Sequence, residues 1–207
     1  MIGTLTSGDV VARVRAFNMR YVQDWRDWLR VSRGCEFLSE EVPIEVAKEF
    51  KRIMGKWQAC RPRRLRSAFE LQRTLAAAVT PLSLIGRSSL RCFESPGRPL
   101  VDAMADLWRV FEDGLCEQSK ASEVGVTKAI LLVTKGRIGP AFDSNVKACL
   151  NAGYVTGPKT HLKALSAIAR ELGQFETRES KRLEDLALEA GRPADVGRII
   201  DMVLGPR

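Results

Sequence analysis

Apolar side chains recur at helical spacing along almost the whole chain. The first stripe has steps of three and four residues, as on one face of an α-helix, and consists of Val10, Val14, Phe17, Tyr21, Trp25 and Trp28. Ser7 to Asp9 precede the stripe and include residue types that cap helices. The pattern predicts one long amphipathic helix from this cap through Trp28.

The same periodicity returns in six further segments. They are marked by Val46, Phe50, Ile53 and Trp57 after Pro43; by Leu65, Phe69, Leu75 and Val79; by Met104, Leu107, Trp108, Phe111 and Leu115; by Leu162, Leu165, Ile168 and Leu172; by Leu183, Leu186 and Ala190; and by Val196, Ile199, Ile200 and Val203 after Pro193. No segment sustains the period-two alternation of a strand. The sequence therefore predicts an all-α protein, a multi-helix orthogonal bundle.

A change of composition divides the chain. Residues 80–99, TPLSLIGRSSLRCFESPGRP, are rich in Pro, Gly and Ser, and predict an irregular connection with a short helical turn inside it. The net charge of +8 lies entirely in residues 1–100, because residues 101–207 contain equal numbers of basic and acidic side chains. We expect a basic helical region over 1–98 and a second helical region over 99–207, which can pack as one compact unit.

Composition argues against several classes of site. The five cysteines, Cys35, Cys60, Cys92, Cys116 and Cys149, show no metal-ligand spacing, and His161 is the only histidine, so a zinc site and a histidine triad are poorly supported. The unpatterned cysteines are typical of reduced thiols in a cytosolic protein. No apolar run approaches the length of a signal peptide or a membrane helix. The sequence predicts a soluble cytoplasmic chain with no membrane partner.

The segment from Glu123 to Leu150, EVGVTKAILLVTKGRIGPAFDSNVKACL, contains the strongest candidate chemistry. Gly125 is expected to turn the chain, and Thr127 to cap the helix that Lys128 begins, leaving N–H groups for a phosphate oxygen. Gly136, Gly139 and Pro140 end that helix, and Asp143 with Ser144 caps the next. A lysine and an aspartate that each open a helix can face each other, as a nucleophile and its electrostatic partner.

A structural reading of the same residues is available. An aspartate at a helix start usually caps the free N–H groups there, and a lysine in the first turns of a helix usually lies at the solvated surface. Aromatic residues at helical spacing usually belong to the core. On spacing alone, these readings outweigh a catalytic one.

The order of residues in this segment resembles the helix-hairpin-helix DNA glycosylases, most closely bacterial proteins with an 8-oxoguanine-glycosylase fold. The similar stretches are Thr127–Leu131 (TKAIL) and Asp143–Val146 (DSNV), and Gly197–Gly205 (GRIIDMVLG) resembles the closing helix of such proteins. The chain departs from the family in two ways. Gly125-Val126-Thr127 keeps only one glycine of the usual Gly-hydrophobic-Gly, and the spacing from lysine to aspartate is shorter.

The resemblance implies a helix-hairpin-helix-like element around 120–150 and a specific reaction on DNA. Lys128 would attack the sugar C1′ of an extruded nucleotide and form a Schiff base, and Asp143 would stabilise the positive charge on the sugar and orient the lysine. A lyase step could follow. No metal or organic cofactor is implied. The lesion would be an oxidised base.

The basic side chains are the candidate DNA contacts. Arg61, Arg63, Arg64 and Arg66 form the densest cluster, while Lys135, Arg137 and Lys147 lie in or beside the hairpin with Gly125 and Thr127. Phe142, directly before Asp143, is the expected stacking partner of a flipped base. Two alternatives stay open: a catalytically inactive DNA-binding protein, and an all-helical protein-interaction protein. The sequence neither indicates nor excludes a homo-oligomer.

Overall fold

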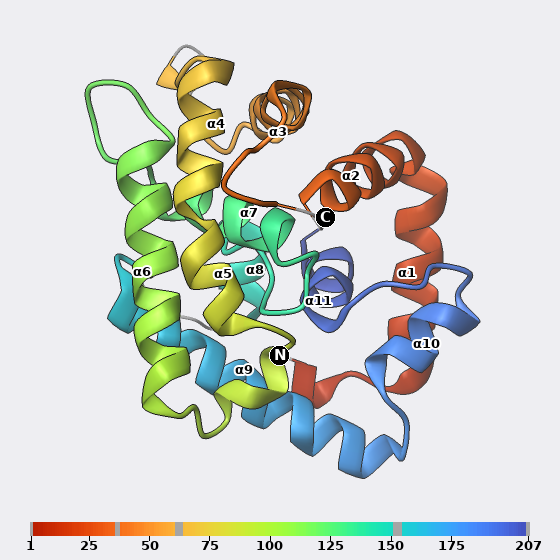
Figure 1. Ribbon diagram of the computed structural model, residues 1–207. Coiled ribbons are helices and arrows are strands. Elements are labelled where there is room, and N and C mark those ends of the chain that lie inside the picture. The colour runs from red at the N-terminus through yellow and green to blue at the C-terminus, as the bar shows by residue number, and fades with distance from the viewer. Residues whose placement is uncertain (1, 36–37, 61–63, 151–154, 206–207) are drawn as a thin grey trace.

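The structure, a computed structural model, describes residues 2–35, 38–60, 64–150 and 155–205 and confirms the all-α class (Figure 1). The described residues contain one isolated β-bridge, between Leu65 and Cys116, and no strand. None of the described helices is long and apolar enough to cross a bilayer. The elements are η1 (Ile2–Thr4), α1 (Ser7–Arg20), α2 (Val22–Gly34), α3 (Ile44–Lys56), α4 (Ala68–Ala77), α5 (Val79–Ile85), η4 (Leu90–Phe93), α6 (Arg98–Gly114), α7 (Glu123–Val133), α8 (Ser144–Leu150), α9 (Pro158–Glu179), α10 (Leu183–Glu189) and α11 (Val196–Leu204).

The first predicted helix is two helices. Thr6 and Asp9 form a capping box at the start of α1, but the helix ends at Arg20, and Tyr21 has φ −123° and ψ 37° before α2 begins. No glycine or proline marks this break. It follows from packing, because α1 lies against α10 and α11 while α2 lies against α3 and α7. Phe17, Trp25 and Trp28 are buried on both sides of the break, so the apolar stripe is kept.

Helix α3 begins after Pro43 as predicted, and its C-terminal end has a Schellman motif. The N–H of Ala59 donates to the carbonyl of Met54 and the N–H of Gln58 donates to that of Gly55, with Gln58 in the left-handed region at φ 49°. The connection predicted over 80–99 is more helical than expected, since α5 covers its first residues and η4 lies within it.

The two predicted regions share one core. Phe50 of α3 stacks on Phe111 of α6, with ring centroids 6.3 Å apart, and both are buried. At the other side of the molecule the backbone N–H of Ile2 donates to Glu171 of α9, and Ser7 donates to Glu179. Figure 1 shows the N-terminal α1 beside α10 and α11 near the C-terminal end of the chain. Helices from both ends of the sequence therefore surround a common interior.

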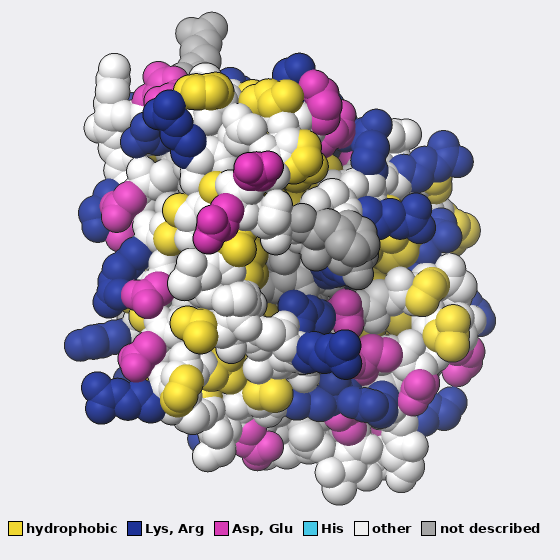
Figure 2. Space-filling view, viewed as in Figure 1, with side chains coloured by type: hydrophobic (Ala, Val, Ile, Leu, Met, Phe, Trp, Pro, Cys, Tyr) yellow, Lys and Arg dark blue, Asp and Glu magenta, His cyan; other side chains and the backbone are white. Residues whose placement is uncertain are grey.

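The surface carries its basic side chains unevenly. Figure 2 shows Lys and Arg gathered over α2 at the upper right, whereas acidic and basic side chains alternate along the left flank beside α6. Helix α2 exposes Arg26, Arg30 and Arg33. Arg30 pairs with Asp27 of its own helix and with Glu49 of α3, so part of this charge is used to join α2 to α3.

Candidate active site

The helix that contains Lys128 begins five residues before it, which corrects the predicted start. Ser122 is the N-cap of α7 and its hydroxyl accepts the N–H of Gly125, so Gly125 lies inside the first turn and Thr127 is not a cap. A Cβ on Gly125 would lie 2.7 Å from the Cys60 sulfur and 2.9 Å from the carbonyl oxygen of Ala59. The glycine therefore serves close helix packing rather than a turn, and it is buried away from any phosphate.

Thr127 holds the loop before α8 against α7. Its hydroxyl donates to the carbonyl of Glu123 at 2.9 Å and accepts the N–H of Phe142 at 3.0 Å. Only 1% of Thr127 is exposed. The predicted phosphate contacts of Gly125 and Thr127 are therefore wrong, because neither residue reaches the surface.

Lys128 lies in the second turn of α7, and its amine faces the end of α3. The ammonium donates to the carbonyl oxygen of Trp57 at 2.7 Å. This carbonyl belongs to the C-cap residue of α3, and such carbonyls have no partner within their own helix. The turn at Trp57 and Gln58 thus presents an acceptor that fixes the position of the amine.

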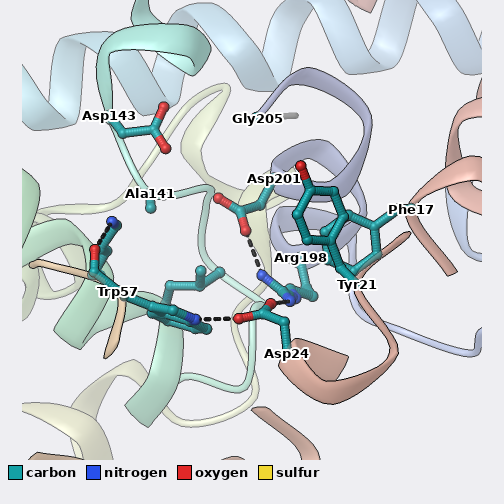
Figure 3. A pocket seen from close by; sticks show the side chains of 11 residues that line it. Phe17, Tyr21, Asp24, Trp57, Ala141, Asp143, Arg198, Asp201 and Gly205 are labelled. Atoms are coloured by element: carbon teal, nitrogen blue, oxygen red, sulfur yellow. Dashed lines mark hydrogen bonds and ion pairs between the residues drawn. The ribbon is translucent and has the colours of Figure 1, made fainter. Parts of the chain in front are cut away.

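Asp143 directly precedes α8 and caps it, as predicted. Its Oδ1 accepts the N–H groups of Asn145 and Val146, each at 3.0 Å, and thereby caps the helix. Asp143 and Lys128 line one pocket, and Figure 3 shows the Asp143 carboxylate directed into it. The hairpin therefore brings the two predicted catalytic side chains to a common cavity, although no direct ion pair joins them among the described contacts.

Long-range contacts supply the opposite wall of the pocket. Arg198 of α11 donates to Asp24 of α2 at 2.8 Å and to Asp201 one turn further along its own helix (Figure 3). The second oxygen of Asp24 accepts the indole N–H of Trp57. The guanidinium is only 2% exposed and lies over the rings of Phe17, Trp28 and Trp57 at 5.2 to 5.5 Å.

The pocket contains more acid than base. Lys128 and Arg198 face Asp24, Asp143 and Asp201, and the cavity is about 200 Å³ in volume. Burial raises the pKa of the Asp201 carboxyl; Arg198 and Lys128 oppose this effect, while Asp143 and Asp24 add to it. At about 30 Å³ per water, the cavity has room for several waters or one small planar ring system.

The remaining residues that line the pocket are mostly apolar. They are Phe17, Tyr21, Trp57, Leu131, Ala141 and Gly205. Tyr21 stands at the break between α1 and α2 and packs against Phe17, with ring centroids 5.0 Å apart. An apolar wall with a few converging polar groups is the usual composition of a small-ligand site.

Phe142 is not available to a base, which corrects its predicted stacking role. Its ring is fully buried and meets His161 edge-on, with centroids 5.6 Å apart. Its backbone N–H donates to Thr127, and the residue does not line the pocket. The aromatic side chains that do line the pocket are Phe17, Tyr21 and Trp57.

The predicted DNA-contacting cations are dispersed. Lys135 and Arg137 line a different cavity of about 650 Å³ with Arg87 and Asp195, and Arg137 donates to the carbonyls of Gly86 and Ser88. Lys147 pairs with Glu123 at 3.0 Å and Arg66 pairs with Glu70 at 3.2 Å. Arg64 is exposed, while Arg61 and Arg63 lie outside the described residues.

Sequence reasoning did not find Asp24, Trp57, Arg198 and Asp201 as site residues. One signal was present, since Arg198 and Asp201 are charged residues three apart in the otherwise apolar helix VGRIIDMVL. Charged side chains at such spacing in a buried helix are rarely without partners. The identity of their partner, Asp24, depends on tertiary packing and carries no local signature.

Comparisons of the chain with protein-family models, with curated proteins and with solved structures gave no match. The likeness to helix-hairpin-helix glycosylases therefore stays a prediction carried by the residues of the hairpin. Within the described part of the chain, no three His, Cys, Asp or Glu side chains are grouped as metal ligands.

Proposed function

We propose that this protein binds DNA and removes a damaged base, with Lys128 as the nucleophile and Asp143 as its electrostatic partner. The observation that carries the proposal is their meeting in one pocket from the middle of α7 and the start of α8. Phe17, Tyr21 and Trp57 add aromatic surface on which a flipped base could stack. The net positive charge of the chain favours a polyanionic partner.

The reaction follows from the chemistry of a primary amine beside a carboxylate. The Lys128 ammonium first gives a proton to water; the amine then attacks C1′ of the sugar, the bond from C1′ to the base breaks, and the base leaves with the electron pair and takes up a proton. Asp143 stabilises the positive charge that develops on the sugar. The lysine nitrogen then loses a proton, its lone pair forms the C=N bond as the C1′–O4′ bond breaks, and O4′ takes up a proton, which opens the sugar ring and gives the Schiff base.

Borohydride trapping tests the nucleophile. The purified protein is incubated with duplexes that contain 8-oxoguanine, other oxidised bases or an abasic site, and the reduced adduct is measured. Wild type and Lys163→Ala, an exposed lysine on α9, are expected to give the adduct, and Lys128→Ala is expected to give none. An absent adduct and absent base release in the wild type, with salt-dependent DNA binding retained, would show a binding protein without this activity.

Asp143→Asn separates the charge from the helix cap. Asparagine caps helices about as well as aspartate, so α8 and the thermal stability should be kept while the carboxylate is lost. The trapping rate is expected to fall about 10²-fold or more, because removing one preorganised electrostatic group from an active site has effects of that order. A rate within a few-fold of wild type would remove Asp143 from the mechanism.

A further inference from the structure

Three hydrogen bonds, two of them made by different groups of Trp57, connect the buried arginine to the proposed nucleophile. Arg198 donates to Asp24, Asp24 accepts the indole N–H of Trp57, and the backbone carbonyl of Trp57 accepts the Lys128 ammonium. These residues come from α11, α2, the end of α3 and α7. Four separate elements are thus connected through side chains that all line one pocket.

Trp57 links the two ends of this network, because its side chain bonds to Asp24 and its backbone carbonyl bonds to Lys128. Its backbone stands in the Schellman turn beside Gln58, whose left-handed backbone is costly for a residue with a side chain. Its indole is held at two points, by the hydrogen bond to Asp24 and by the Arg198 guanidinium stacked 5.5 Å from the ring centroid. Because the indole is held in place, the backbone carbonyl of Trp57, which accepts the hydrogen bond from Lys128, is held in place as well.

Arg198 is itself held at both terminal nitrogens, whereas its buried Nε has no hydrogen-bond partner among the described residues. Asp24 and Asp201 take its two terminal nitrogens, and the rings of Phe17 and Trp28 cover its faces with Trp57. A charge this deeply buried is stable only when it is paired and hydrogen-bonded. The guanidinium therefore has little freedom to move, and its hydrogen bond to Asp24 restrains the position of that carboxylate.

We propose that Arg198, Asp24 and Trp57 are positioning residues that orient the Lys128 amine in the pocket. The catalytic part of this inference rests on the proposed function; the orientation of the amine does not. None of the three needs to touch the reacting atoms. They act on Lys128 through the carbonyl of Trp57.

Trp57→Phe and Trp28→Phe form a matched pair of variants. Both remove an indole N–H beside the same guanidinium, but the Trp57 N–H bonds to Asp24 while the Trp28 N–H has no partner among the described residues. The Trp57 variant keeps its backbone carbonyl. Asp24→Asn breaks the chain at the next link and keeps the shape of the side chain.

The first measurement is independent of DNA. Limited reductive methylation with formaldehyde and cyanoborohydride is followed by mass spectrometry of the Lys128 peptide, with thermal unfolding of each variant as a check on the fold. Lys128 is expected to be labelled several-fold faster in Trp57→Phe and Asp24→Asn than in wild type and Trp28→Phe. Equal rates in all four folded proteins would overturn the inference.

The second measurement is the trapping rate on an abasic-site duplex as a function of pH. Trp57→Phe is expected to lower the rate about tenfold and to change the pH at half-maximal rate, while Trp28→Phe, whose ring does not line the pocket, follows the wild type. A wild type that forms no adduct refutes the proposed function, and the labelling rates still decide whether the chain positions Lys128. Adduct formation with parallel behaviour of both tryptophan variants overturns the positioning role alone.

Discussion

At the scale of single residues, Gln58 has an unfavourable backbone conformation, with φ 49° in the left-handed region. It is one of four described non-glycine residues with positive φ, and it completes the turn whose carbonyl binds Lys128. A side chain in the left-handed region costs about 1–2 kcal/mol relative to the usual regions. Glycine avoids most of this cost, although its greater freedom in the unfolded chain offsets part of the gain.

Gln58→Gly should therefore raise the free energy of unfolding by about 0.5–1 kcal/mol. Urea unfolding at neutral pH measures the change. Gly191, which already holds the equivalent position after α10 at φ 78°, provides the comparison: Gly191→Gln should lower stability by a similar amount. A destabilised Gln58→Gly would mean that the glutamine side chain makes a contribution beyond its backbone.

His161 is buried between aromatic rings and lacks a partner for Nδ1 among the described residues. Burial lowers its pKa to about 3 from the ordinary 6.5. Below pH 6.5 the unfolded chain binds a proton that the folded chain refuses, so this residue destabilises the fold increasingly as the pH falls from 6.5 toward 3.

His161→Leu should remove this dependence. Between pH 6 and pH 4 the wild type is expected to lose about 1.4 kcal/mol per pH unit more than the variant. Denaturant unfolding of both proteins at pH 4, 5, 6 and 7.5 gives the difference directly. Parallel stability curves over this range would show that His161 titrates normally.

At the scale of elements, one buried carboxylate joins α2 to α3. Asp27, with 2% of its side chain exposed, pairs with Arg30, Arg52 and Lys56. The hydrogen bond from Arg52 is the largest influence on Asp27 and lowers its pKa below the usual range, with Lys56 and Gln23 adding to the effect. This stabilisation is present above pH ~3.9 and is lost as the pH falls through the lowered pKa.

Asp27→Asn should destabilise the protein by about 3 kcal/mol at pH 7, the low end for a broken buried pair, because the three cations are each about half exposed. The loss should be smaller at pH 3 than at pH 7, because at pH 3 the unfolded chain already binds a proton at Asp27 while the folded chain, with its lowered pKa, does not. Glu45→Gln, which breaks the exposed pair with Lys48 on α3, is the control and should change stability by less than about 1 kcal/mol.

The positions of most helices could be predicted because their apolar periodicity is local. The break at Tyr21 could not, since it is set by the packing of α1 against α10 and α11 and of α2 against α3 and α7. The start of α7 was misplaced because Ser122 and Thr127 are both competent caps; the contact of Gly125 with Ala59 and Cys60 lets the helix begin at the earlier one.

The candidate site likewise contains residues that the sequence places near each other and residues that only tertiary packing brings together. Lys128 and Asp143 lie in one hairpin, so the sequence suffices to bring them near each other. Arg198 and Asp24 are separated by most of the chain, and only the shared core brings them together. Phe142 precedes Asp143 as predicted, but its ring packs in the core against His161, and that contact depends on tertiary packing.

At the scale of the whole molecule, pairing decides which positive charges are available to a polyanion. Arg66 forms an ion pair with Glu70, and Lys147 forms one with Glu123. Arg26 and Arg33 are exposed on α2 and pair with no described residue. Asp24, on the same helix, lines the pocket. Unpaired cations release more counterions from DNA than cations already neutralised by a neighbour.

The double variant Arg26→Ala, Arg33→Ala should therefore weaken DNA binding more than Arg66→Ala, Lys147→Ala. The slope of log affinity against log salt is expected to fall by about 1–2 in the first variant and by less in the second. Fluorescence anisotropy with a labelled duplex between 50 and 200 mM salt gives both slopes. A wild type without salt-dependent binding would favour the protein-interaction alternative.

The tryptophans around Arg198 give the pocket an optical property. Trp57 lines the cavity, while Trp25 and Trp28 stack with centroids 5.0 Å apart and Trp28 shares the guanidinium with Trp57. Indole emission responds to nearby charge and to water, so a molecule that enters the cavity should change the intrinsic fluorescence of the unlabelled protein. The emission spectrum can thus serve as a built-in screen for ligands, with the spectrum of Trp57→Phe as its blank.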